Sequence, residues 1–211
     1  GLLLPKLSKT TDIVERYLMS RGVHPVIIRH CIDNKLLFES SDYHNAVFIG
    51  YDKDCKARYG ALRGTVGNYK GELTGSDKHF AFSLNENPNT DHVHVFESAI
   101  DLLSFATLEL LEGRDWKAET LLSLAGVFQT KREGVVPVAL TQFLNERPSV
   151  CQIRLHLDND AVGRCAAKEI ASGLQGKYQV CDEPPSCGKD VNDELRTRVG
   201  QMKKRKEPER T

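Results

Sequence analysis

The chain lacks the features that mark several large classes of protein. No apolar run approaches the ~20 residues that a transmembrane helix requires. The opening stretch 1–5 has neither the length nor the basic start of a signal peptide, and it resembles the cut edge of a larger protein. The six cysteines include no Cys-x-x-Cys pair, so the sequence encodes no zinc ribbon. We therefore expect a reduced, cytoplasmic protein.

An excess of charge is also missing, because 29 Lys and Arg balance 29 Asp and Glu. The charges are unevenly placed: residues 196–211 hold seven Lys or Arg against two Glu, which leaves the rest of the chain acidic overall. The net field of an acidic body does not attract nucleic acid, so any such binding needs a local basic groove. We interpret 196–211 as a solvated basic C-terminal tail.

Residues 1–88 have the pattern of a small mixed α+β domain. Apolar residues recur at helical spacing in two segments, which start at Asp12 and Pro25. A glycine-rich, polar stretch at 64–75 is predicted to be a loop. Strand-like pieces are expected at 36–38, 46–51, 57–63 and 79–83. The Asn- and Pro-containing stretch 85–91 is the best linker, and we place the domain boundary there.

Residues 89–195 alternate predicted strands with predicted helices. Alternation of this kind builds a parallel sheet with right-handed crossovers and helices on both faces, which is an α/β fold. The strands are expected at 92–96, 121–124, 151–157 and 178–181, and the helices at 98–111, 136–145 and from 161 onward.

Acidic residues follow two of these strands. Glu97 ends the first strand, while Asp158 and Asp160 lie between strand 151–157 and the next helix. The carboxyl ends of parallel strands share one sheet edge, where ligands bind. Mg²⁺ takes one or two carboxylates together with substrate phosphates, so the three acids form a candidate metal site. Alternatively, Asp160 is only the N-cap of the helix that follows.

Further polar residues lie near these acids in the sequence. Asp101, one turn after Glu97, could cap its helix or support the metal shell. Lys189, Asp190 and Asp193 follow a Pro-Pro turn. The lysine could contact a phosphate or pair with the acids, and Asp190 could instead cap the final helix.

Three histidines are weaker candidates for metal ligands than the acids. His92 and His94 alternate along one predicted strand, and we interpret them as surface or supporting residues. His156 is expected on the same face as Asp158, where it is a candidate for orienting a carboxylate.

Four motifs follow one another along the second half of the chain: Glu97 with Asp101, Ser123-Leu124-Ala125-Gly126, Asp158-x-Asp160-x-x-Gly163-Arg164-x-Ala166-Ala167 and Lys189-Asp190-x-Asn192-Asp193. In this order they resemble the motifs of the Toprim domain, the metal-binding fold of bacterial primases, topoisomerases and related nucleases. The run 157–164 is closest to the primase form, and Tyr17-Leu18-x-x-Arg21-Gly22 is similar to the start of the primase polymerase core. One departure is Ser98, which replaces the usual glycine after the catalytic glutamate.

The resemblance implies a Rossmann-like Toprim domain at 89–195. It also implies Mg²⁺- or Mn²⁺-dependent nucleotidyl transfer on DNA, as in the bacterial primase-like proteins of conjugative and other mobile elements. Single-stranded DNA and nucleoside triphosphates would be the partners, with zinc-binding or helicase domains flanking this chain. The residues implied as catalytic and metal-binding are Glu97, Asp158 and Asp160, supported by Asp101, Lys189, Asp190 and Asp193. The residues implied as contacts to nucleic acid or nucleotide are Arg63, Lys70, Lys78 and Arg164.

Two other functions stay open at this point. A Toprim nuclease would cut or rejoin DNA strands with the same acids, although no tyrosine lies beside them to form a topoisomerase's covalent link. A non-catalytic DNA-binding or assembly module is favoured by Ser98 and by the acidic body. A shared fold does not guarantee activity, so the choice depends on the site itself.

Overall fold

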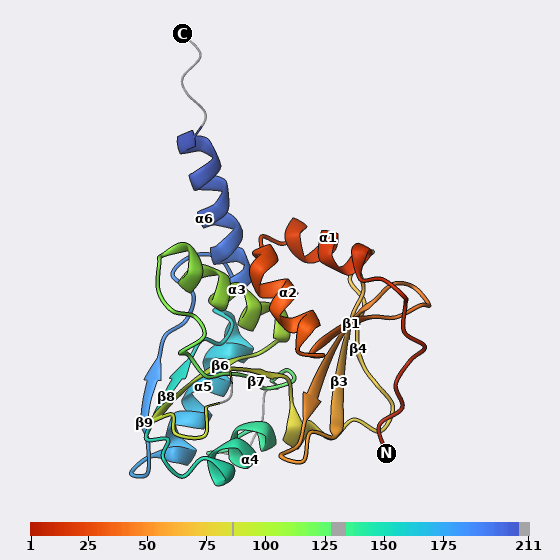
Figure 1. The fold of residues 1–211 in the computed structure, drawn as a ribbon. Helices are drawn as coiled ribbons and strands as arrows, with labels where there is room; N and C mark the ends of the chain where they lie inside the picture. Colours follow the sequence, from red (N-terminus) through yellow and green to blue (C-terminus); the bar gives the residue numbers. More distant parts are fainter. Residues whose placement is uncertain (86, 128–133, 207–211) are drawn as a thin grey trace.

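The computed structural model describes residues 1–85, 87–127 and 134–206, without the side chains of the last two (Figure 1). The chain folds around two sheets, one in each half of the sequence. Within the described ranges, no helix combines the length and the apolar character needed to cross a lipid bilayer.

The first half has two helices and an antiparallel four-stranded sheet of order β1-β2-β3-β4. Pro25 begins α2, and the ring of His24 caps it by accepting from the backbone N–H of Val26 at 3.2 Å. The elements are α1 (Asp12–Ser20), α2 (Pro25–Asp33), β1 (Leu37–Glu39), β2 (Ala46–Tyr51), β3 (Ala57–Arg63) and β4 (Lys70–Glu72).

Strand β4 corrects the prediction of a loop over 64–75. It pairs antiparallel with β3, and Lys70 lies opposite Arg63. The strand lies at the edge of its sheet and leaves both Lys70 and Glu72 exposed. The alternation of buried apolar residues that announces a strand is therefore missing from its sequence.

The predicted strand at 79–83 is also wrong for most of its length. Residues Lys78–Phe80 form a short 3-10 helix, η1, which Asp77 caps by accepting from the backbone N–H of His79 at 3.1 Å. Only Ser83–Leu84 form a strand, β5, and it pairs antiparallel with β7 (Leu121–Ser123). Residues that precede the predicted domain boundary thus extend the sheet of the second half.

The second half confirms the predicted α/β class. Its five-stranded sheet has the order β5-β7-β6-β8-β9, in which every pairing except β5 with β7 is parallel. The remaining strands are β6 (His92–Phe96), β8 (Gln152–Leu155) and β9 (Gln179–Asp182). The helices are α3 (Ala99–Leu111), α4 (Val138–Glu146), α5 (Ala161–Leu174) and α6 (Val191–Lys206).

Helices cover both faces of this sheet. Phe96 of β6 packs into an apolar cluster with α3 and α6, whereas its neighbours Val93 and Val95 pack into a second cluster with α4 and α5. Alternate residues of one strand point to opposite faces, so the two clusters lie on opposite sides of the sheet. This is the doubly covered parallel sheet that the sequence predicted.

The first apolar cluster joins the two halves. It combines Leu18 of α1 and Phe48 of β2 with Leu103 of α3 and Leu195 of α6, each at most 1% exposed. The rings of Phe48 and Phe82 meet edge to face, with centroids 5.4 Å apart. The small sheet is therefore held against the second half by buried apolar surface, which is the dominant stabilising contribution in folding.

The described part of the predicted basic tail, 196–206, is helical throughout. Helix α6 continues to Lys206, and its C-terminal end extends away from the rest of the protein (Figure 1). Residues 207–211 of the predicted tail lie outside the described residues.

Candidate active site

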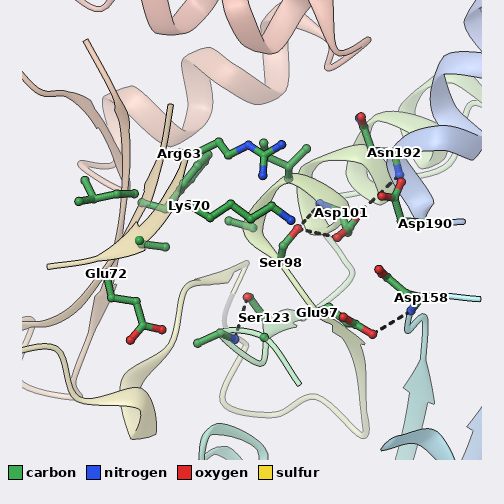
Figure 2. Close-up of a pocket in the computed structure, with 18 of the residues that line it drawn as sticks. Arg63, Lys70, Glu72, Glu97, Ser98, Asp101, Ser123, Asp158, Asp190 and Asn192 are labelled. Carbon is green, nitrogen blue, oxygen red and sulfur yellow. Dashed lines mark hydrogen bonds between the residues drawn. The ribbon is translucent and has the colours of Figure 1, made fainter. Parts of the chain in front are cut away.

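A cleft of about 450 Å³ lies between the small sheet and the carboxyl edge of the second sheet (Figure 2). Its walls come from β3 and β4 on one side and from the segments that follow β6, β7 and β8 on the other. The polar side chains that line it are Arg21, Tyr59, Arg63, Lys70, Glu72, Glu97, Ser98, Asp101, Ser123, Asp158, Lys189, Asp190 and Asn192.

Glu97 lies directly after β6, half-buried beside Asp158. Its Oε1 accepts the backbone N–H of Asp158 at 3.1 Å, so the β6 and β8 ends are tied together at this residue. Burial raises the pKa of Glu97 to about 7, and the nearby charges of Asp158, Asp160 and Asp101 act in the same direction. A carboxyl group with a pKa near neutrality can both accept and release a proton.

Lys189 lies between the two aspartates of the β8–α5 turn. Its Nζ is 3.4 Å from Asp158 Oδ2 and 3.1 Å from Asp160 Oδ2. Asp160 also caps α5, because its Oδ1 accepts the backbone N–H of Gly163 at 2.9 Å. That hydrogen bond and the lysine lower the pKa of Asp160, whereas burial and the charge of Asp190 raise the pKa of Asp158. Asp160 is therefore the predicted cap and a member of the acid cluster at once.

Gly163 and Arg164 shape the turn that carries Asp158. A Cβ on Gly163 would lie 2.1 Å from the Asp158 carbonyl oxygen and 2.8 Å from Glu97 Oε1, so only glycine fits. Arg164 donates to the carbonyl oxygens of Leu157 and Asp158 at 3.0 and 3.3 Å and forms an ion pair with Asp182. The guanidinium that was predicted to contact nucleic acid thus braces the turn, and Arg164 is not among the residues that line the cleft.

Asp101 lies deeper, behind Ser98. It is 6% exposed, and burial raises its pKa to about 7, assisted by the charges of Asp190 and Asp158. Ser98 donates its hydroxyl to Asp101 Oδ2 and accepts the Asp101 backbone N–H at 3.3 Å, so it is the N-cap of α3. Its φ of −132° and ψ of 161° are extended values that any residue adopts, and the backbone here does not need glycine.

Replacing Ser98 therefore should affect the cap and not the backbone. Ser98→Gly is expected to lower the free energy of unfolding by only a few tenths of a kcal/mol, and Ser98→Ala by about 1 kcal/mol. Urea denaturation of the three proteins measures the difference. A glycine variant that is clearly more stable than the native chain would show that Ser98 is strained after all.

The residues after the Pro-Pro turn hold the start of α6 against the site. Asp190 accepts the backbone N–H of Asp193 at 2.8 Å, and Asp193 accepts that of Lys189 at 3.0 Å. Asn192 was not predicted as a site residue, although it lies within the Lys189–Asp193 motif. Its amide donates to Arg21 O and Ser104 Oγ, each at 2.9 Å, which joins α6 to the first half of the chain.

The predicted basic residues separate into two groups. Arg63 and Lys70 extend from the small sheet toward the side of the cleft that carries Ser98 and Asp101 (Figure 2). Arg63 donates to Tyr17 Oη at 3.1 Å, while no hydrogen bond or ion pair within the described part of the chain holds the Lys70 ammonium group. Lys78 instead pairs with Glu72 at 2.9 Å and is not a lining residue of the cleft.

His156 does not orient a carboxylate of the site. One ring nitrogen is 2.8 Å from His94 Nδ1, the other is 3.1 Å from the Glu183 carbonyl oxygen, and the ring stacks on Phe96. The side chain thus packs against β6, away from the Asp158 carboxylate with which it was expected to interact.

Two family models match the chain. Residues 94–195 match a family described as Toprim-like, and residues 16–88 match one described as a protein of unknown function (DUF3991). A 65 kDa protein of Zymomonas mobilis is 29% identical over 216 residues, which cover 96% of this chain and 34% of that protein. The chain therefore spans about a third of the length of this curated relative.

Solved structures with a similar fold include primase cores. The primase fragment of the bacteriophage T7 primase-helicase is 18% identical with a TM-score of 0.59, over 90% of this chain and 72% of that one. The RNA polymerase domain of Mycobacterium tuberculosis primase is 13% identical with a TM-score of 0.58, over 94% and 75%. The catalytic domain of a DnaG primase bound to single-stranded DNA is 14% identical with a TM-score of 0.55, over 93% and 75%. These likenesses establish the fold.

Proposed function

Because residues 94–195 form a Toprim-like domain within a primase-core fold, we propose that the chain catalyses Mg²⁺-dependent nucleotidyl transfer on DNA in the manner of a primase. One observation carries the proposal: Glu97 and Asp158 line the same cleft as Arg63 and Lys70. Such a cleft offers acids for a divalent cation on one wall and cations for phosphates on the other. The mobile-element setting and the flanking domains remain predictions from the resemblance.

The donor atoms of the acid edge are of the kind that suits a hard divalent cation. Glu97, Asp158 and Asp160 supply carboxylate oxygens, the ligands that Mg²⁺ and Mn²⁺ prefer. Their mutual repulsion contributes to the raised pKa values of Glu97 and Asp158, and a cation relieves it. Lys189 already places a positive charge beside both aspartates, so the ion would compete with its ammonium group. When bound, Mg²⁺ neutralises phosphate charge and stabilises the charge that develops in phosphoryl transfer.

The protein's own groups would divide the remaining work. Where Glu97 is not a ligand of the ion, its oxygen that is not bonded to the Asp158 N–H would take the proton of an attacking hydroxyl, because its pKa then lies near neutrality. Arg63 and Lys70 would hold template or triphosphate. Lys189, released from its ion pairs, could also contact a phosphate.

Products formed from single-stranded DNA distinguish this proposal from its alternatives. The full chain is incubated with unlabelled template, labelled nucleoside triphosphates and Mg²⁺ or Mn²⁺. Labelled oligonucleotides that require the template support primase-like transfer, and Glu97→Gln should abolish them. A shortened template without new oligonucleotides would identify a nuclease, and binding without either product would identify a DNA-binding module.

Binding of single-stranded DNA should depend on Lys70 more than on Lys78. Lys70 is not paired with an acid within the described chain, whereas Lys78 is held by Glu72. Arg63→Ala with Lys70→Ala should therefore weaken binding and lower the slope of log K against log[salt] by about 0.7 for each lost phosphate contact. Lys78→Ala is the matched control and should change the slope little. Equal effects of Lys70→Ala and Lys78→Ala would place the DNA outside the cleft.

A further inference from the structure

A second cluster of potential metal ligands lies at the opposite end of the strands from the acids. His92 begins β6, His94 follows on the same face, and Glu119 precedes β7. Within the described residues, these three side chains bring one ligand atom each within 4.8 Å of one another. Nε2 of His92 and Nε2 of His94 lie 2.7 and 2.9 Å from the same oxygen, Glu119 Oε2.

Hydrogen bonds around His94 determine which of its nitrogens carries a hydrogen. His156 Nδ1 faces the Glu183 carbonyl oxygen at 3.1 Å, and a carbonyl oxygen only accepts, so this nitrogen must donate. In a neutral His156 the other nitrogen, Nε2, is then an acceptor. His94 Nδ1, 2.8 Å away, therefore donates to it. In a neutral His94 the lone pair of Nε2 therefore points at Glu119 Oε2, so that two hydrogen-bond acceptors face each other.

Two acceptors at 2.9 Å repel each other unless a proton or a metal ion lies between them. A proton on His94 would charge a side chain that is 5% exposed and packed between the rings of His156 and Phe105, with centroids 5.0 and 4.6 Å away. Such burial disfavours an imidazolium ion. A metal ion satisfies the lone pairs of both groups and leaves the His94 ring neutral.

We propose that His92, His94 and Glu119 bind a transition-metal dication of the Zn²⁺ class. Two imidazoles and a carboxylate are a donor set that suits Zn²⁺, and a site with three protein ligands keeps one position for water. The side chains of His92 and Glu119 are 28% and 26% exposed, so solvent reaches this position. The ion would join the start of β6 to the segment before β7, independently of the acid site.

The surroundings match those of metal-bound histidines. Such rings commonly donate their second N–H to a carboxylate or another acceptor, which fixes the tautomer. His92 Nδ1 lies 2.7 Å from Asp91 Oδ1, and His94 Nδ1 donates to His156. Ligands at ~2.0–2.1 Å from a tetrahedral zinc are about 3.3 Å apart, so the Glu119 carboxylate must move outward by about half an ångström. A side chain that is 26% exposed has room for that movement.

Titration of the metal-free full chain with Zn²⁺, followed by calorimetry, tests the site. Mg²⁺ is present in excess and the exposed thiols are alkylated, so that neither the acids nor cysteines compete. We expect one equivalent of Zn²⁺ per chain. Affinity should fall by about 100-fold or more in His92→Gln, His94→Gln and Glu119→Gln, and by about 10- to 100-fold in the supporting variant Asp91→Asn. Co²⁺ absorption should report nitrogen and oxygen ligands.

His79→Gln is the matched control, because His79 is an exposed histidine whose Nδ1 also lies 2.7 Å from an aspartate oxygen, on Asp77. It should bind Zn²⁺ like the native chain, as should Asp158→Asn. If His94→Gln fails to fold, His92→Gln and Glu119→Gln decide, because both replace partly exposed side chains. The proposal is overturned if the native chain binds no Zn²⁺, if these two variants keep full affinity, or if Asp158→Asn alone abolishes binding.

Discussion

Asp158→Asn is expected to remove most of the stabilisation that Mg²⁺ gives the native chain, together with its metal-dependent activity. Saturation at 100 times the dissociation constant stabilises a folded protein by about 2.7 kcal/mol. For a chain of this size that corresponds to a rise in Tm of about 5–10 °C. The substitution removes one charge of the proposed metal site with little change of shape, so most of the rise should disappear. Activity should fall by about 10²- to 10³-fold.

The same variant should be at least as stable as the native chain when a chelator is present. Burial and Asp190 disfavour the ionised form of Asp158 in the folded state. The ion pair with Lys189 offsets little, because that lysine side chain is 58% exposed. Thermal melts of both proteins, with chelator and with metal, make the comparison. A variant that loses stability in chelator yet keeps the whole response to metal would show that Asp158 has a structural role only.

The metal response should also depend on pH. Glu97 and Asp101 have pKa values near 7 in the fold, against ordinary values of 4.5 and 3.8. At a pH between the ordinary and the raised pKa values, the folded protein keeps protons that the unfolded chain releases. The free energy of unfolding of the metal-free protein therefore falls as pH rises from about 4 to about 7 and then levels off. Metal competes with the same protons. The gap between the Tm values with and without Mg²⁺ should therefore be small at about pH 5 and largest at about pH 8.

Gly163→Ala is expected to damage both the fold and the metal response. Its Cβ would meet the Asp158 carbonyl oxygen at 2.1 Å, and that backbone cannot retreat freely because Arg164 holds it. Overpacking of this kind costs about 1–3 kcal/mol, which outweighs the gain in helix propensity. The turn that carries Asp158 should shift, so Mg²⁺ should raise the Tm of the variant less than that of the native chain.

Gly200→Ala is the matched control for this substitution. Gly200 also lies in a helix, α6, but a Cβ there meets no atom within 4 Å. The alanine should leave the free energy of unfolding unchanged or raise it by up to about 1 kcal/mol, and the Tm should follow. The response to Mg²⁺ should stay that of the native chain. Equal Tm values for the two variants would contradict the assigned role of Gly163.

The acid edge could be predicted because it depends on local order along the chain. Glu97 follows a strand in which histidine and valine alternate, and Asp158 follows the next parallel strand in the sheet, so topology alone brings them together. The same reasoning predicted the α/β fold, since periodicity distinguishes its strands from its helices. In each case the information lies within about ten residues of the feature it predicts.

Other features depend on partners that are distant in the sequence. Arg164 was predicted to contact nucleic acid, and its ion pair with Asp182, 18 residues later, could not be predicted from the sequence around it. His94 looked like a supporting residue because Glu119 and His156 lie 25 and 62 residues away. Local pattern carries no sign of such pairs, and only the folded sheet brings them into contact.

The shared core has a consequence for the order in which the chain can fold during synthesis. Leu195 packs with α1 and α2, and the Asn192 amide reaches Arg21 O across 171 residues of sequence. Helices α1 and α2 therefore leave the ribosome before α6, which completes the cluster that buries them, and β5 likewise precedes its partner β7. Contacts this far apart slow folding and prolong the exposure of apolar residues. A nascent chain stalled before α6 should therefore bind holdase chaperones more than the full chain does, because the part of this cluster that α6 covers is still exposed.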